Sequence, residues 1–297
     1  MKKNYAYAIV SVLIWATMAA VVKLLLAAIP NLQALAVSSA LAFLFLLLLS
    51  LKSGAWRELK KYRAKDFATI ASLGFLGFFL YSALYYYGIS QLTSQEACIL
   101  NYLWPITLMI FSTVILKERF TVIKGAAMLC SFFGIVILSV GSGGVAAGNT
   151  LIGMLSCVAA AVAYGLFSVL NKRADYNQNI AMMMMWLVTA VAAALLGVFT
   201  EEWQPIVGVQ WLGMLWLGVV VSAVAYLCWA LALRGGENTA KIANLAYLTP
   251  FLSLVVSRVL LGEQIRPRAI VALVFIVGGI LMQSLCEQLF PHLRQKQ

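Results

Sequence analysis

The stretch that decides the fold is LNYLWPITLMIFSTVILKE, residues 100–118, because the chain repeats it as LAYLTPFLSLVVSRVLLGE, residues 245–263. In each copy a tyrosine lies three residues before a proline, and a glutamate lies 13 residues after that proline. Gly134 and Gly279 each lie 29 residues beyond the proline of their copy. Apolar helices resemble one another by chance, but chance does not preserve this spacing. The pattern therefore indicates a duplicated unit.

The duplication extends toward the N-terminal side of each copy. The same shift of 145 residues places Tyr81 on Tyr226. Near the start of each half, a shift of 149 residues places Trp15 on Tyr164. Aromatic residues are therefore among the repeated positions.

Composition predicts a membrane protein. The 297 residues are 63% hydrophobic and 10% charged, with a mean hydropathy of +0.95. A soluble fold cannot bury so large an apolar share, whereas apolar runs of about 18 residues or more can cross a ~30 Å hydrocarbon core. The sequence predicts an all-α membrane protein with ten transmembrane helices. Their expected ranges are 5–28, 32–51, 67–89, 93–116, 123–141, 150–171, 179–199, 211–233, 238–261 and 268–288.

The basic residues predict the orientation. If the N-terminus is cytoplasmic, 17 of the 21 Lys and Arg residues lie in cytoplasmic segments, and only Arg266 and Arg268 lie in outer loops. This bias predicts that both termini are cytoplasmic, in a multi-pass protein of a bacterial inner (plasma) membrane. Each half holds five spans, an odd number, so residues 1–145 and 146–297 are expected to form two inverted five-helix repeats. Such repeats are found in many secondary transporters.

The same analysis excludes several functions. The net charge of +11 comes from short loops between spans, where anionic lipid explains it better than nucleic acid. His292 is the only histidine, and the Walker A, G-x-S-x-G and H-E-x-x-H motifs are absent. The five cysteines lie in apolar stretches without a C-x-x-C pair. We expect no enzyme activity, no cofactor and no metal site, and no ATP-driven transport.

Aromatic and small polar residues recur at helical spacing inside several spans. Tyr81 and Tyr85 lie mid-span, where a phenol needs a hydrogen-bond partner or a wet cavity. The alternative is an interfacial aromatic belt or helix packing, which suits Trp56 and Trp203 near span ends. The expected walls of a central substrate-binding cavity are Trp15, Tyr81, Tyr85, Asn101, Tyr102, Trp104, Tyr164, Tyr226, Trp229 and Tyr247.

Four further residues are candidates for a hinge or a gate. Pro105 and Pro250 lie mid-span at matching positions, and interrupted helices at matching places in two halves indicate a transport site. A structural kink is the alternative. Lys23 could recognise a carboxylate or extend its ammonium group to the interface. Glu96 could gate the site or bind an ammonium group, or it could stabilise a helix N-terminus.

These residues together resemble a known family. Trp15 and Lys23 in the first span, with Pro–x12–Glu–x15–Gly in each half, are similar to the ten-helix EamA type of the drug/metabolite transporter superfamily. The segment EACILNYLWP, residues 96–105, resembles the E-x4-NYLWP stretch of the aromatic amino acid exporter branch. The resemblance implies a central, largely apolar cavity. By resemblance its lining roles pass to Trp15, Tyr81, Tyr85, Tyr102, Trp104 and Tyr164.

The sequence also departs from that branch. Tyr164 stands where the family can use tryptophan, and a methionine run occupies Met182 to Met185. A different cavity shape, and with it a different amino acid preference, follows from these changes.

Three functions stay open at this point. The first is a secondary transporter that exports amino acids or related metabolites, with aromatic or Met-like side chains favoured, by alternating access through the aromatic cavity. The second is efflux of cationic drugs or quaternary amines through cation–π contacts in the same cavity. The third is a membrane enzyme or scaffold that does not transport. The expected partners are a small-molecule substrate and the lipid bilayer, without nucleic acid, and the sequence leaves both a monomer and an oligomer open.

Overall fold

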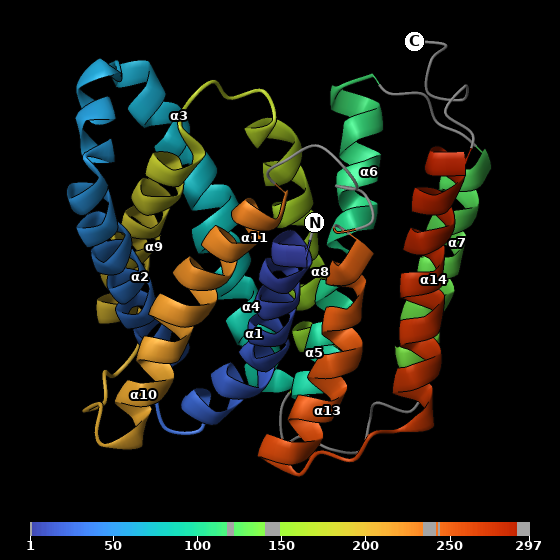
Figure 1. Cartoon of the computed structure of the whole chain (residues 1–297). Helices are drawn as coiled ribbons and strands as arrows, with labels where there is room; N and C mark the ends of the chain where they lie inside the picture. Colours follow the sequence, from blue (N-terminus) through green and yellow to red (C-terminus); the bar gives the residue numbers. More distant parts are fainter. Residues whose placement is uncertain (1, 118–121, 140–148, 234–241, 243, 290–297) are drawn as a thin grey trace.

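The computed structural model describes residues 2–117, 122–139, 149–233, 242 and 244–289, and every regular element within them is a helix. The α-helices are α1 (Lys2–Leu26), α2 (Asn31–Ser53), α3 (Ala64–Gly74), α4 (Tyr81–Gln91), α5 (Ser94–Asn101), α6 (Trp104–Ile115), α7 (Val122–Ser139), α8 (Thr150–Asn171), α9 (Gln178–Thr200), α10 (Val209–Leu215), α11 (Ala225–Leu233), α13 (Thr249–Leu261) and α14 (Pro267–Leu289). The other helical segments are the 3-10 helices η1 (Ala55–Lys61) and η4 (Asn244–Leu248), and the π-helices η2 (Phe75–Leu80) and η3 (Trp216–Val224). Figure 1 shows one bundle, with α7 and α14 paired at its edge.

Within the described residues, seven helical stretches are long and apolar enough to cross a membrane, judged by length and composition. They are Lys3–Leu26, Asn31–Ser53, Ala64–Gln91, Ser94–Ile115, Thr150–Asn171, Gln178–Thr200 and Val209–Leu233. Shorter apolar helices occupy Gly125–Leu138, Leu245–Leu261 and Pro267–Met282. The chain is thus an all-helical membrane protein. The expected loop at 141–148 and the first residues of the expected ninth span lie outside the described residues.

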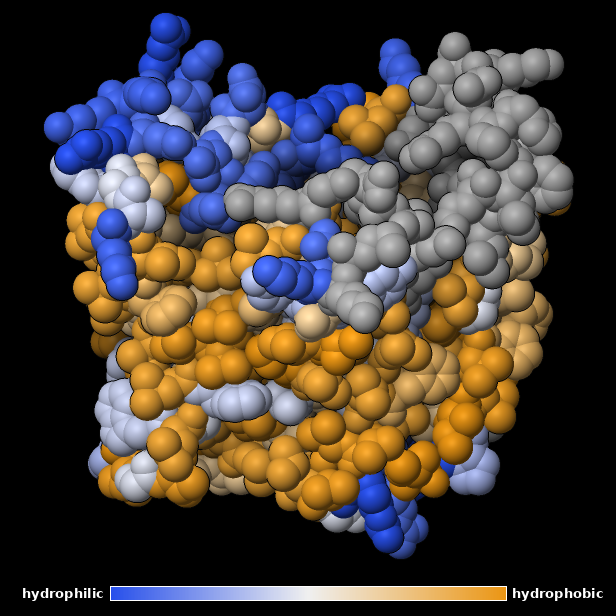
Figure 2. Space-filling model, in the orientation of Figure 1, coloured by the Kyte–Doolittle hydropathy of each residue, from blue (hydrophilic) through white to orange (hydrophobic). Residues whose placement is uncertain are grey.

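The surface separates two ends of the bundle. Figure 2 shows apolar residues over the middle of the visible face, whereas hydrophilic residues gather mainly at one end. That end carries η1 with the exposed side chains of Arg57, Lys60 and Lys61, and we call it the basic end. The end where α5 begins and α13 ends is called the opposite end. A middle band of apolar side chains between two polar ends is the distribution that a bilayer requires.

Helices at equivalent places in the two halves pack in matching pairs. Helix α2 packs on α9, its own equivalent, and α7 packs on its equivalent, α14. The contact of α4 with α8 has its counterpart in the contact of α11 with α1. The contact of α6 with α8 likewise corresponds to that of α13 with α1. This exchange of partners is the pattern of a two-fold axis between the halves.

The pair formed by α7 and α14 shows the direction of that axis. A Cβ atom added at Gly134 would lie 2.8 Å from the carbonyl oxygen of Ala272, and one added at Gly279 would lie 2.7 Å from that of Ala127. Gly134 corresponds to Gly279 and Ala127 to Ala272 under the shift of 145, so the two contacts are equivalent. Contact moves up one helix as it moves down the other, so the two helices run antiparallel. Glycine allows the close approach of their backbones.

Two kinds of helix irregularity also recur at equivalent places. The π-helix η2 ends directly before Tyr81, and η3 ends one residue before Tyr226. The fourth expected span is interrupted between α5 and α6, and η4 interrupts the ninth directly before α13. Pro105 and Pro250 lie in the first turn of α6 and α13, where a missing N–H removes no helical hydrogen bond. The expected interruptions are therefore present, and each lies directly before its proline.

Candidate functional site

Four aromatic rings meet at the centre of the bundle as two equivalent pairs. The ring centroids of Trp15 and Tyr226 are 5.2 Å apart, and those of Tyr81 and Tyr164 are 4.9 Å apart. The hydroxyl groups of Tyr164 and Tyr226 form a hydrogen bond that joins the two pairs. We call these four residues the central cluster. Two of them begin or nearly begin a helix after a π segment, so the irregular backbone of both halves positions the cluster.

The central cluster encloses a small cavity of about 30 Å³. Its walls are Trp15, Met18, Gly77, Phe78, Tyr81, Ser82, Tyr164, Trp186, Val221, Ser222 and Tyr226. A space of this size holds about one water molecule. The rings therefore nearly close the centre of the bundle in this structure.

The two helix breaks contact each other beside the cluster. Asn101, at the end of α5, donates from Nδ2 to the Tyr81 hydroxyl at 3.1 Å. The Tyr102 hydroxyl donates to the carbonyl oxygen of Ala246 at 2.9 Å. Ala246 lies four residues before Pro250, which has no N–H to offer that carbonyl. The tyrosine of one break thus satisfies the acceptor that the proline of the other break leaves open.

The structure places the remaining expected cavity residues next to the cluster rather than on its cavity. Trp104 lies edge to face with Tyr164 at 5.4 Å between centroids, and Trp229 lies 5.3 Å from Trp15. Tyr247 is partly buried in η4 against the main hydrophobic core. Tyr85 stacks on Tyr81 at 5.9 Å and is only 2% exposed.

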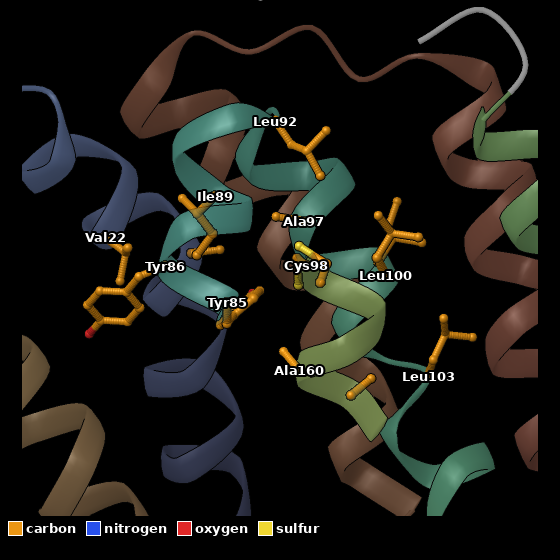
Figure 3. Packing of buried hydrophobic residues seen from close by; sticks show 14 of the residues in the cluster. Val22, Tyr85, Tyr86, Ile89, Leu92, Ala97, Cys98, Leu100, Leu103 and Ala160 are labelled. Atoms are coloured by element: carbon orange, nitrogen blue, oxygen red, sulfur yellow. The ribbon is translucent and has the colours of Figure 1, made fainter. Parts of the chain in front are cut away.

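The environment of Tyr85 is a packed core. Figure 3 shows its side chain in α4 among buried residues of the neighbouring helices, including Cys98 of α5 and Ala160 of α8. Tyr85 is not among the residues that line the cavity. Its position supports Tyr81 from behind.

Sequence reasoning missed two large residues of the cavity wall. The Trp186 indole N–H donates to the carbonyl oxygen of Ser222 at 3.0 Å, within the π-helix η3. Phe78 packs edge to face against Trp186 at 4.8 Å. A tryptophan in the middle of an apolar span is the signal that could have identified this wall. The adjacent methionine run points elsewhere, because Met183 and Met185 are buried in a second hydrophobic cluster.

Lys23 and Glu96 both lie at the opposite end, away from the cavity. The Lys23 ammonium group donates to the carbonyl oxygens of Ile89, Ser90 and Leu92 at 2.7, 3.2 and 2.6 Å. These carbonyls lie at the C-terminal end of α4, where a cation is favoured. Lys23 therefore ties α1 to α4.

Glu96 has two sets of contacts. It forms a capping box with Thr93 at the start of α5, and its Oε1 accepts from Arg268 of α14 at 3.0 Å. A negative charge in the first turn of a helix is stabilising. The carboxylate thus links the start of α5 to α14.

Two more carboxylates seal helix N-termini at the same end. Glu201, at the end of α9, accepts from the backbone N–H groups of Leu32 and Gln33 at the start of α2. Glu263, after α13, accepts from the N–H groups of Ser94 and Gln95 at the start of α5. Both contacts join a second-half carboxylate to a first-half helix. The equivalent residue of Glu263, Glu118, lies outside the described residues.

Within the described ranges, no group of three or more His, Cys, Asp or Glu side chains could hold a metal ion. The described cysteines, Cys98, Cys130, Cys157 and Cys228, are free. The chemistry that the cluster offers is aromatic contact with a few hydroxyl, amide and indole groups.

Comparison with known proteins identifies the family. The model of the EamA-like transporter family matches residues 2–140 and again residues 151–285. The chain belongs to this family. It is a transporter of the drug/metabolite transporter superfamily and not an enzyme.

Several relatives of this EamA-like transporter carry descriptive names. It is 28% identical over 215 residues to "Aromatic amino acid exporter YddG" of Ancylobacter novellus, covering 71% of this chain and 74% of that protein. It is 27% identical over 226 residues to a "Probable terminal-alkyne amino-acid exporter" of Streptantibioticus cattleyicolor, covering 75% of each. An "Uncharacterized transporter" of Clostridium kluyveri is 24% identical over 292 residues, covering 95% of this chain and 93% of that protein.

A solved crystal structure shares the fold. It superposes with a TM-score of 0.68 at 21% sequence identity, covering 98% of this chain and 99% of the other. The likeness therefore extends over the whole bundle.

Proposed function

We propose that this EamA-like transporter exports amino acids or related small metabolites by alternating access through the central cluster, with aromatic or Met-like side chains favoured. The observation that carries the proposal is the convergence of both π-helices and both helix breaks on four aromatic rings. Non-helical backbone at membrane depth is tolerated where it is buried by protein or lines a cavity, and matching interruptions in two halves are typical of transport sites. The named functions of two relatives support the amino acid class.

The proposal includes an architecture. We propose ten spans in two inverted five-helix repeats, residues 1–145 and 146–297, with both termini cytoplasmic in a bacterial inner membrane. The seven long and three shorter apolar helices agree with ten spans. The antiparallel contact of Gly134 and Gly279 across α7 and α14 supports the inversion. The basic end would then face the cytoplasm.

Efflux of cationic drugs or quaternary amines is the second candidate. The aromatic rings could provide cation–π contacts of about 0.5–2 kcal/mol each. However, no residue among the described walls of the cavity is acidic. Glu96, the carboxylate that the sequence suggested for this role, is paired with Arg268 at the opposite end. The site therefore favours a neutral or zwitterionic substrate.

The test is transport by purified protein in liposomes, using competition by a panel of amino acids and of quaternary amines, with and without a pH gradient. We expect Tyr81→Ala and Trp104→Ala to reduce transport while folded yield and melting temperature stay near those of the wild type. Phe199→Ala is the matched control, because that ring is 85% exposed on the outer surface of α9. Normal transport by both well-folded cluster variants would refute the proposed site. Exclusive competition by amines would favour the second candidate.

A further inference from the structure

The opposite end holds a second cleft, far larger than the central cavity. Its volume is about 390 Å³, within the range of small-molecule sites. The start of α5, the connection from α13 to α14, and the start of α14 form its walls. Its lining residues are Thr93, Gln95, Glu96, Gly262, Glu263, Gln264, Arg266, Arg268 and Ala269.

One carboxylate in this cleft occupies the N-terminus of α5. Glu263 accepts from the Ser94 N–H at 2.8 Å, the Ser94 hydroxyl at 3.0 Å and the Gln95 N–H at 3.3 Å. The Ser94 hydroxyl is also 2.7 Å from that of Ser257 on α13. A helix N-terminus leaves backbone donors without helical partners, and these donors favour an anion. We call this group of donors the α5 seat.

The α5 seat is surrounded by donors that Glu263 does not use. Gln95 is 3% exposed, and its Nε2 group has no hydrogen-bond partner. Buried amide donors nearly always have one, so this group is suited to a further acceptor. Arg266 lines the same cleft, and no described residue forms an ion pair with it, whereas Arg268 is engaged with Glu96.

The contact between Glu263 and the seat also has to break during transport. It joins the end of α13 in the second half to the start of α5 in the first. In an alternating-access cycle the two halves separate at each end in turn. When this end opens, Glu263 leaves and two backbone N–H groups and one hydroxyl lose their acceptor.

We propose that the α5 seat is a carboxylate-binding site, which Glu263 fills while this end is closed and which the carboxylate of the departing substrate takes when the end opens. This inference rests on the proposed amino acid transport. A substrate carboxylate offers the same two oxygens as Glu263. Gln95 Nε2 and the Arg266 guanidinium group add donors for it, and the remaining volume of the cleft takes the substrate's side chain.

The experiment empties the seat and refills it with a small carboxylate. Glu263→Ala should lower the melting temperature of the protein in liposomes, and formate should restore it in proportion to its concentration. Sodium chloride at the same ionic strength should restore nothing, and the wild type should not respond to formate. Glu201→Ala is the matched control, because it empties the N-terminus of α2, a place that does not line the cleft.

Two results would overturn the seat. One is absence of any formate effect on Glu263→Ala. The other is equal restoration of Glu201→Ala, which would show a general property of helix N-termini. A further arm compares L-phenylalanine with phenethylamine, which lacks the carboxylate. Only L-phenylalanine should stabilise Glu263→Ala.

A second variant keeps Glu263 in place and covers the case in which Glu263→Ala does not fold. Arg266→Ala should raise the KM for L-phenylalanine applied from this end by about 2- to 5-fold, as expected for one exposed ion pair, with an unchanged melting temperature. An unchanged KM would refute the seat. If the wild type transports no amino acid, the proposed function fails. If it transports amino acids but neither variant responds as stated, the seat alone fails.

Discussion

Adjacent glycines in α14 should respond in opposite ways to the same added methyl group. A Cβ at Gly279 would lie 2.7 Å from the Ala127 carbonyl oxygen, whereas one at Gly278 would have no atom within 4 Å. Backbone cannot rotate away as a side chain can, so α7 and α14 must separate, which costs about 1–3 kcal/mol. Alanine also gains about 0.5–1 kcal/mol over glycine inside a helix. Gly279→Ala should therefore lose about 1–2 kcal/mol, and Gly278→Ala should gain about 0.5–1 kcal/mol.

The measurement is thermal unfolding of both variants in the same detergent, at the same protein concentration and heating rate. With roughly 2–4 °C per kcal/mol for a large domain, the midpoint should fall by several degrees for Gly279→Ala and stay level or rise for Gly278→Ala. Gly134→Ala, on α7, should behave like Gly279→Ala because its contact is equivalent. Equal midpoints for the two adjacent variants would refute the close contact between the helices.

Three other outcomes follow from the fold and the central site. Tyr102→Phe should lower stability by about 1–3 kcal/mol, because it leaves a buried carbonyl without its donor; chemical or thermal unfolding measures this. Pro105→Ala and Pro250→Ala should slow turnover while substrate affinity is kept and stability changes little, since a first-turn proline removes no helical hydrogen bond; a stability loss that parallels the transport loss would favour a simple kink. In a background without native cysteines, a cysteine at Gln204 should react with an impermeant thiol reagent from outside and one at Lys61 should not; reversed labelling would refute the proposed orientation.

The repeat and the helix interruptions could be predicted from the sequence because each leaves a local mark. The shift of 145 residues that aligns Pro105 with Pro250 also predicts which positions make equivalent contacts. Proline removes a backbone donor, so it marks a break wherever it occurs mid-span. The pairing of Trp15 with Tyr226 and of Tyr81 with Tyr164 agrees with the same alignment.

Other features of the site depend on contacts between distant segments and leave no such mark. The π-helices consist of ordinary apolar residues whose composition matches that of α-helix, so the sequence did not indicate them. Trp186 belongs to the cavity wall because of its bond to the Ser222 carbonyl of another helix. Glu263 was expected to anchor its loop through nearby basic residues. It instead binds α5, which is 169 residues away in the chain.

A site made from two separate copies of one chain has to be the same on both sides. Here the two sides belong to one chain, and equivalent positions carry different chemistry: Asn101 faces Ala246, and Trp15 faces Tyr164. The amide that holds the Tyr81 hydroxyl therefore has a methyl group as its counterpart beside Tyr226. A molecule with a polar head and an apolar tail meets two unlike sides, so it can fit in one orientation only.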